Sequence, residues 1–189
     1  MEEDVLPDKK NSKRGRETLF RATYQNQSNL IQMADNKANI IISINTMIIS
    51  SIIAITGYGA VAGKIDSYGA DAVIPISMII LSCLISVIFA IQAARPKIIK
   101  PKVVDGAMQR SSLLFFGVIA GYSQQEYVAE IDRLLASGDE LYEHMTIDIY
   151  NQGLVLKRKY DLLAYAYQVF MFGFILSVLI FLVFLAIRP

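Results

Sequence analysis

Histidine, the side chain that most often carries acid–base or metal chemistry, occurs once in this chain, at position 144. Its acidic neighbours Glu143 and Asp148 do not stand at a metal-ligand spacing, and the sequence holds no phosphate loop, dinucleotide fingerprint or serine elbow. The single cysteine, Cys83, has no partner in the chain for a disulfide or a metal cluster. A structural role for His144 is therefore favoured over a catalytic one. We expect no enzyme activity, no cofactor and no metal.

Two groups of charged residues offer binding chemistry instead. The basic run 157–159 can set membrane topology and attract anionic lipid, worth about 1 kcal/mol per charge, and it can also hold a ligand phosphate. Asp35 and Lys37 flank Asn36 just before an apolar stretch. They are either interfacial charges or a pair that orients a small polar ligand, and both interpretations stay open.

These residues must be positioned by apolar elements, because 54% of the chain is hydrophobic and its mean hydropathy is +0.42. Charged residues are absent from Asn39 to Gly63, from Ala72 to Ala94 and from Leu162 to Ile187. Each stretch exceeds the roughly 20 residues that cross a bilayer as a helix. The first follows a long polar arm, so we expect a retained anchor and not a cleaved signal peptide. The sequence predicts three transmembrane helices.

The distribution of basic residues predicts how these helices are oriented. Seven Lys and Arg precede the first span and nine lie between the second and the third, which is sixteen of the eighteen in the chain. The positive-inside tendency places both segments in the cytoplasm and the C-terminus outside. The balance of 18 basic and 17 acidic residues argues against a nucleic-acid partner.

The fold class that follows is a mostly α membrane protein with three transmembrane helices, a small cytoplasmic and mainly helical module, and first and third spans extended into the cytoplasm. Apolar residues at steps of three and four from Leu19 to Ala34 predict an amphipathic helix that continues into the first span. The predicted segments are a disordered cytoplasmic tail (1–16), a cytoplasmic amphipathic helix (17–37), the first span (38–58), an extracytoplasmic loop (59–71), the second span (72–94), a cytoplasmic sensor module (95–163) and the third span (164–187).

Local patterns predict the elements of the module. Pro96 and Pro101 stop the second helix. The apolar run 113–119 is typical of one strand or a buried extended piece, and it could also lie at the membrane interface. Capping boxes at Ser123 with Glu126 and at Ser137 with Glu140 predict two consecutive helices, the second of which can run unbroken into the third span.

Polar and small residues recur on single faces of the first two spans. Asn39, Ser43, Thr46 and Ser50 share one face of the first helix, whereas Asn45 points elsewhere. Interhelical hydrogen bonds are the favoured interpretation, and a face that lines a hydrated path is the alternative. In the second span, small residues at steps of four predict a packing seam. The residues predicted for gating or helix packing are Asn39, Ser43, Asn45, Thr46, Ser50, Ser82 and Ser86.

Several motifs resemble a known family. They are Asn26-x-x-Asn29-Leu30-x-x-x-Ala34-Asp35-Asn36-Lys37-Ala38-x-Ile40 with Ser43-Ile44-Asn45, Leu114-Phe115-Phe116-Gly117, Glu126-Tyr127, and Asp148-Ile149-Tyr150-x-x-Gly153-x-x-Leu156-x-x-Lys159-Tyr160. From Glu17 to the C-terminus the chain resembles the transmembrane (PycTM-type) effector family of Pycsar antiphage systems. Some members of that family carry a phosphohydrolase domain, which this sequence lacks.

The resemblance implies an effector in the bacterial inner membrane. A neighbouring cyclase makes cCMP or cUMP on phage infection, and the effector then impairs the membrane and causes abortive infection. The implied partners are the lipid bilayer, the cyclic pyrimidine nucleotide and further copies of the chain, because three helices enclose no useful pore. The residues predicted to bind the ligand are Asp35, Lys37, Phe116, Asp148, Tyr150 and Lys159.

Two other function classes stay open from sequence. The exposed stripe from Leu19 to Ala34 could dock a cytoplasmic partner, which would make the chain a non-enzymatic scaffold or regulatory subunit. A small transporter or a membrane enzyme ranks last, because internal repeats and charged midplane residues are absent from the sequence.

Overall fold

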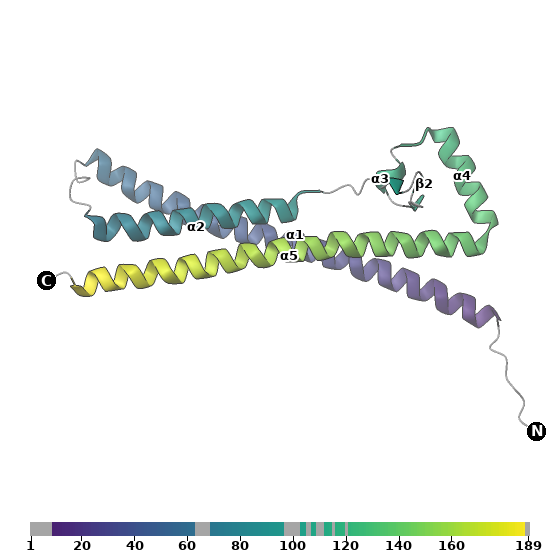
Figure 1. The fold of residues 1–189 in the computed structure, drawn as a ribbon, viewed down its shortest axis with the longest axis horizontal. Helices are drawn as coiled ribbons and strands as arrows, with labels where there is room; N and C mark the ends of the chain where they lie inside the picture. Colours follow the sequence, from purple (N-terminus) through teal and green to yellow (C-terminus); the bar gives the residue numbers. More distant parts are fainter. Residues whose placement is uncertain are drawn as a thin grey trace, which may run out of the picture. The chain divides into compact units, whose positions relative to one another are not determined.

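A computed structural model describes residues 9–62, 69–96, 103–104, 107–108, 112–114, 116–119 and 121–187. The chain forms two compact units. Unit 1 combines Met1–Ile31 with Pro96–Leu156, and unit 2 combines Gln32–Arg95 with Lys157–Pro189. Two long helices, α1 and α5, each contribute residues to both units (Figure 1).

Helix α1 spans Lys9–Val61, 53 residues without a break. This confirms the prediction that the amphipathic segment continues into the first span. The helix begins at Lys9, inside the segment 1–16 for which the polar composition predicted a tail, and residues 1–8 lie outside the described residues. Extending an existing helix adds one hydrogen bond per residue fixed, so a polar segment can join a helix that its neighbours have already nucleated.

Helix α2 spans Ala70–Ala94, 25 residues, with Pro75 inside it. It ends where the sequence predicted, because Arg95 leaves the helical conformation and Pro96 cannot continue it. The amide of Arg95 still bonds the carbonyl of Ile91 at 2.9 Å. Residues 63–68 of the predicted loop and Pro101 lie outside the described residues.

Helices α4 and α5 are the two consecutive helices that the capping patterns predicted. α4 spans Gln124–Ala136 and begins with a complete capping box, in which Ser123 and Glu126 bond each other's amides. α5 spans Gly138–Ile187, 50 residues, so the prediction of an unbroken helix into the third span is confirmed. Ser137 contacts α5 through its carbonyl, which accepts from the amide of Leu141 at 3.1 Å.

The segment between α2 and α4 holds short elements. Strands β1 (Val103–Val104) and β2 (Ala107–Met108) pair antiparallel, with Val103 opposite Met108. The prediction of a strand or extended piece over 113–119 is wrong: residues 113–114 form a turn and helix α3 spans Phe116–Ile119. A short apolar run cannot be assigned to strand or helix from periodicity alone, which explains the error.

The core of unit 2 lies where α1, α2 and α5 meet, and four of its six residues are alanines, which let helix backbones approach closely. The buried residues of this core are Ala38, Ile41, Ala90, Ala93, Leu163 and Ala166. The predicted small-residue seam of the second span is therefore a packing surface. α1, α2 and α5 are each long and apolar enough to cross a membrane, which confirms the prediction of three spans.

Helices α2 and α5 approach each other closely at Gly173. A Cβ atom built on Gly173 would overlap the side chain of Ser82, whose hydroxyl donates to the carbonyl of Val169 at 2.9 Å. Ser177 on α5 similarly donates to the carbonyl of Pro75 at 2.7 Å. Bulkier residues of α5, such as Phe172 and Leu185, are exposed.

We predict that Gly173→Ala destabilises unit 2, because the added methyl group separates α2 from α5. Overpacking of this kind costs about 1–3 kcal/mol, measured as a lower thermal midpoint of the purified protein in detergent. Gly57→Ala is the matched control, since nothing lies within 4 Å of its position on α1. Alanine there favours the helix by up to about 1 kcal/mol. Equal midpoints for the two variants would contradict this packing.

Candidate functional site

A hydrogen-bonded seam joins the three helices of unit 2. Asn45 on α1 is fully buried, and its side-chain amide donates to the carbonyl of Ile41 at 2.7 Å and to the hydroxyl of Ser86 on α2 at 3.1 Å. That hydroxyl donates to the carbonyl of Ala166 on α5 at 2.8 Å. The other side-chain atom, Asn45 Oδ1, is buried without a hydrogen-bond partner among the described residues. The seam thus links the helices through polar groups in an apolar stretch.

The polar face predicted on α1 does not take part in this seam. Asn39, Ser43, Thr46 and Ser50 are all exposed, and Ser43 donates to the carbonyl of Asn39 in its own helix at 2.9 Å. The face turned to the core carries Ala34, Ala38, Ile41 and Asn45 instead, at the same helical spacing. This face can be buried because its small side chains allow close approach and because Asn45 donates both to its own helix, at Ile41, and to Ser86 on α2.

Three of the residues predicted to bind a ligand lie together in unit 2. Lys159 on α5 forms an ion pair with Asp35 on α1, and the exposed fractions of the two side chains are 10% and 39%. The ammonium group of Lys37 lies 5.8 Å from the ring centre of Tyr160, and the hydroxyl of Tyr167 donates to the Lys37 carbonyl at 3.4 Å. These contacts hold α1 against α5. They satisfy the charges of Asp35 and Lys159 within the chain.

The pair stands near the start of unit 2 on both helices. Asp35 is the fourth residue of that unit on α1, and Lys159 is the third on α5. Removing one partner of a buried pair leaves the other charge uncompensated, so the pair fixes how these two helices pack. By contrast, Lys157 pairs with Asp161 at 2.9 Å on the exposed side of α5.

The other predicted ligand residues belong to unit 1. Asp148 is 5% exposed, whereas Tyr150 is 64% exposed. Phe116 begins α3, and its side chain lies outside the described residues. The six predicted residues are therefore divided between the two units, three in each. Asp35, Lys37 and Lys159 form a brace between helices, and Asp148 borders a cavity.

That cavity has a volume of about 740 Å³ and lies within unit 1. It is large enough for a small organic ligand, whose pockets usually measure about 300–1,000 Å³. Its lining combines aromatic, amide and charged side chains from α1 and α5 with one residue of the turn before α3. The lining residues are Glu17, Phe20, Arg21, Tyr24, Gln25, Ser28, Asn29, Leu114, Met145, Asp148 and Ile149.

Sequence reasoning found Asp148 but missed the rest of this lining. The α1 members recur at helical steps from Glu17 to Asn29, and polar residues at such steps usually mark a solvated helix face. The signal that could have revealed the cavity is the mixture of Phe20 and Tyr24 with Arg21 on that face.

Asp148 is the one buried charged group of the cavity. Its Oδ2 accepts from Nε2 of Gln152 at 3.1 Å, and its Oδ1 is buried without a partner among the described residues. Burial raises the pKa of this carboxyl above its ordinary value, and the bond from Gln152 opposes the shift only in part. An unpaired buried carboxylate oxygen is costly, so Asp148 calls for a donor that none of the described residues supplies.

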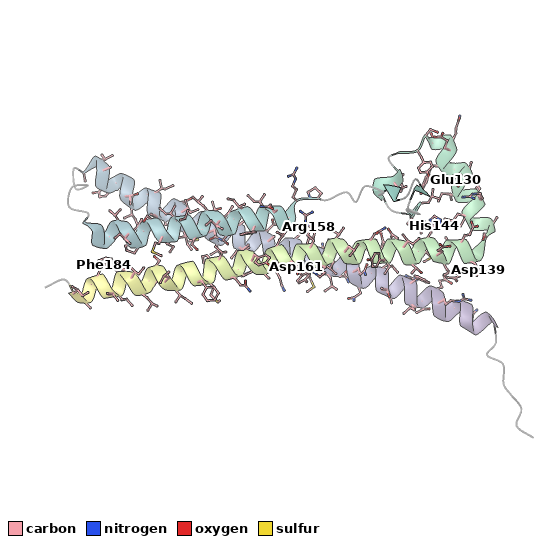
Figure 2. The ribbon with its side chains drawn as sticks, in the orientation of Figure 1. Glu130, Asp139, His144, Arg158, Asp161 and Phe184 are labelled. Atoms are coloured by element: carbon pink, nitrogen blue, oxygen red, sulfur yellow. The ribbon has the colours of Figure 1, made fainter. Side chains whose placement is uncertain are left out.

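His144 has a structural role in unit 1. Its Nδ1 accepts from the backbone amide of Leu113 at 3.1 Å, which ties α5 to the turn before α3 (Figure 2). On the neighbouring turn of α5, the ring of Tyr142 stacks on Phe20 of α1, with ring centres 5.5 Å apart, and Arg16 lies over the same ring. These contacts position the α1 and α5 walls of the cavity.

Together, these features define a class of protein: a helical multi-pass membrane protein in which two spanning helices also contribute to unit 1, which holds a cavity lined by apolar, polar and charged side chains. Residues 19–187 match the family described as the Pycsar effector protein domain, so the chain belongs to that family. Membership assigns it to the effectors of antiphage defence. Comparisons with curated proteins and with solved structures gave no match.

We predict that Lys159→Met lowers the stability of unit 2 by about 1–3 kcal/mol, because the carboxylate of Asp35 loses its partner. The loss is smaller than for a fully buried pair, since Asp35 is 39% exposed. Thermal unfolding followed by circular dichroism measures it. Lys157→Met breaks the exposed pair with Asp161 and is expected to leave the stability almost unchanged, because solvent screens this pair. An equal loss in both variants would show that the brace does not depend on burial.

We also predict a pH-dependent gain from Asp148→Asn. Because burial raises the pKa of Asp148, the folded protein holds this proton more tightly than the unfolded chain, and stability falls as the pH rises from the ordinary pKa of 3.8 through the folded value. Asparagine stays neutral and escapes this loss. The difference in thermal midpoint between variant and wild type should therefore grow from pH 4 to pH 7. A difference in thermal midpoint that stays constant between pH 4 and pH 7 would contradict this prediction.

Proposed function

We propose that this chain is a non-enzymatic membrane effector that a cyclic pyrimidine nucleotide, cCMP or cUMP, activates. The nucleotide comes from a neighbouring cyclase after phage infection. Activation impairs the integrity of the bacterial inner membrane and ends in abortive infection. Membership of the Pycsar effector family supports the antiphage role.

The observation that carries this proposal is the continuity of α1 and α5. Each helix begins in unit 1 and continues without a break into the apolar stretch of unit 2. A ligand that favours one arrangement of these helices in unit 1 therefore acts on the same helices in the bilayer. The ligand shifts the population only as far as its affinities for the two arrangements differ.

Charge distribution supports the orientation. The arm before the first span and the segment between the second and third spans carry sixteen of the eighteen Lys and Arg residues. The positive-inside tendency then places unit 1 and the N-terminus in the cytoplasm and the C-terminus outside the inner membrane. A nucleotide made in the cytoplasm reaches unit 1 directly in this orientation.

The exposed polar face of α1 supports assembly of several copies. Asn39, Ser43, Thr46 and Ser50 lie on a helix that is apolar enough to span a membrane. Exposed polar groups in hydrocarbon favour contact with another helix or with a water-filled path. A homo-oligomer built on this face provides neighbouring helices, and a water-filled path can form between its copies. Polar residues at such a position could gate the path in a membrane-disrupting effector.

The scaffold alternative has less support. The stripe from Leu19 to Ala34 was its docking surface, but Phe20 stacks on Tyr142 and Ala34 is buried in the same chain. Leu19 and Tyr24 remain exposed, at 64% and 52%.

The test is dye release from liposomes that contain the purified protein. We expect cCMP or cUMP to release the dye and cAMP to release none at the same concentration. Empty liposomes with nucleotide and protein-containing liposomes without nucleotide give the background. If dye release does not depend on cCMP or cUMP, activation by these nucleotides is wrong.

A further inference from the structure

The cavity of unit 1 combines the groups that recognise a small anionic heterocycle. Tyr24 and Phe20 provide aromatic rings, Arg21 provides a guanidinium group, and Asp148 provides a buried carboxylate. Aromatic rings stack on heterocyclic bases, and guanidinium groups bind phosphate. This set of groups fits a nucleotide better than it fits an apolar or a purely cationic ligand.

The unpartnered oxygen of Asp148 specifies the base. Oδ2 accepts from Gln152, and Oδ1 has no partner in the part of the chain that the structure describes, so Oδ1 is the oxygen left to accept a hydrogen bond. Carboxylates accept from the N4 amine of cytosine. Uracil has no such amine, and its ring N–H stands between two carbonyl oxygens that repel a carboxylate. The base that suits Oδ1 is therefore cytosine.

We propose that this cavity binds a cytosine nucleotide, with Asp148 Oδ1 accepting from the N4 amine and Arg21 facing the phosphate. This rests on the proposed function and assigns its ligand site, which lies in unit 1 and not at Asp35, Lys37 and Lys159. The ligand contacts α1 and α5 at once, because Arg21 belongs to one helix and Asp148 to the other. Binding thus acts on both of the helices that continue into the membrane.

The experiment measures binding of radiolabelled cCMP to the full chain in lipid nanodiscs, with unlabelled cUMP and cAMP as competitors. We expect cCMP to bind at least tenfold more tightly than cUMP, the ratio given by about 1.4 kcal/mol. Asp148→Ala should weaken cCMP binding by at least tenfold, because a hydrogen bond to a charged group is worth about 1.5–3 kcal/mol. Ser28→Phe should abolish cCMP binding, because the phenylalanine ring fills the cavity from an exposed position of α1.

Matched controls place the same changes outside the cavity. Asn26→Phe adds the same ring at another exposed position of α1, and Asp139→Ala removes an exposed carboxylate of α5 (Figure 2). Both should bind cCMP as the wild type does. Thermal midpoints of all four variants show that they are folded, and Ser28→Phe keeps the test valid if Asp148→Ala does not fold.

The outcomes separate this inference from the proposed function. If cCMP or cUMP releases dye while Ser28→Phe and Asp148→Ala bind as the wild type does, the cavity assignment is overturned and the proposed function stands. Equal affinity for cUMP and cCMP would overturn the recognition of cytosine by Asp148. If the wild type neither binds nor responds to either nucleotide, both the proposed function and this site are wrong.

Discussion

Helices that cross hydrocarbon gain little from the hydrophobic effect when they pack together, so unit 2 depends on close approach and on polar contacts. Ala38, Ala90, Ala166 and Gly173 bring the three helices near enough for hydroxyl groups of α2 to reach carbonyl groups of α5. The partly buried pair of Asp35 and Lys159 requires the same proximity between α1 and α5. Small residues are thus the condition for these polar contacts between the helices of unit 2.

Unit 1 is stabilised by different interactions. Its contacts are aromatic stacking, a histidine that accepts from a backbone amide, and a capping box at the start of α4. They border a cavity in which a carboxylate oxygen has no partner among the described residues. A protein that leaves such a group unsatisfied loses stability at that point, and a ligand that supplies the donor restores it. Stability that depends on a ligand in this way fits the role proposed for unit 1, which is to respond to binding.

The long helices could be predicted from the sequence, but helix α3 and the buried faces of the long helices could not. The length of a charge-free stretch is set by the thickness of the bilayer, and proline ends a helix by local chemistry, so the three spans and the end of α2 at Ala94 could be predicted. Which face of α1 is buried depends on where α2 and α5 approach it, and periodicity favoured Asn39, Ser43, Thr46 and Ser50 over the face of Asn45. The partners Asp35 and Lys159 are 124 positions apart, and no local pattern joins them.

Helix α1 runs without a break between Asn29 and Ala34. A helix turns by about 100° per residue. One residue inserted between Asn29 and Ala34 would therefore turn Ala34 and Asn45 by about 100° around the helix axis relative to Asn29. The same holds on α5 between Asp148 and Lys159. Insertions or deletions should therefore be tolerated in these two intervals only in steps that preserve helical phase, such as about seven residues. The contacts of α1 and α5 thus depend on helical phase as well as on residue identity.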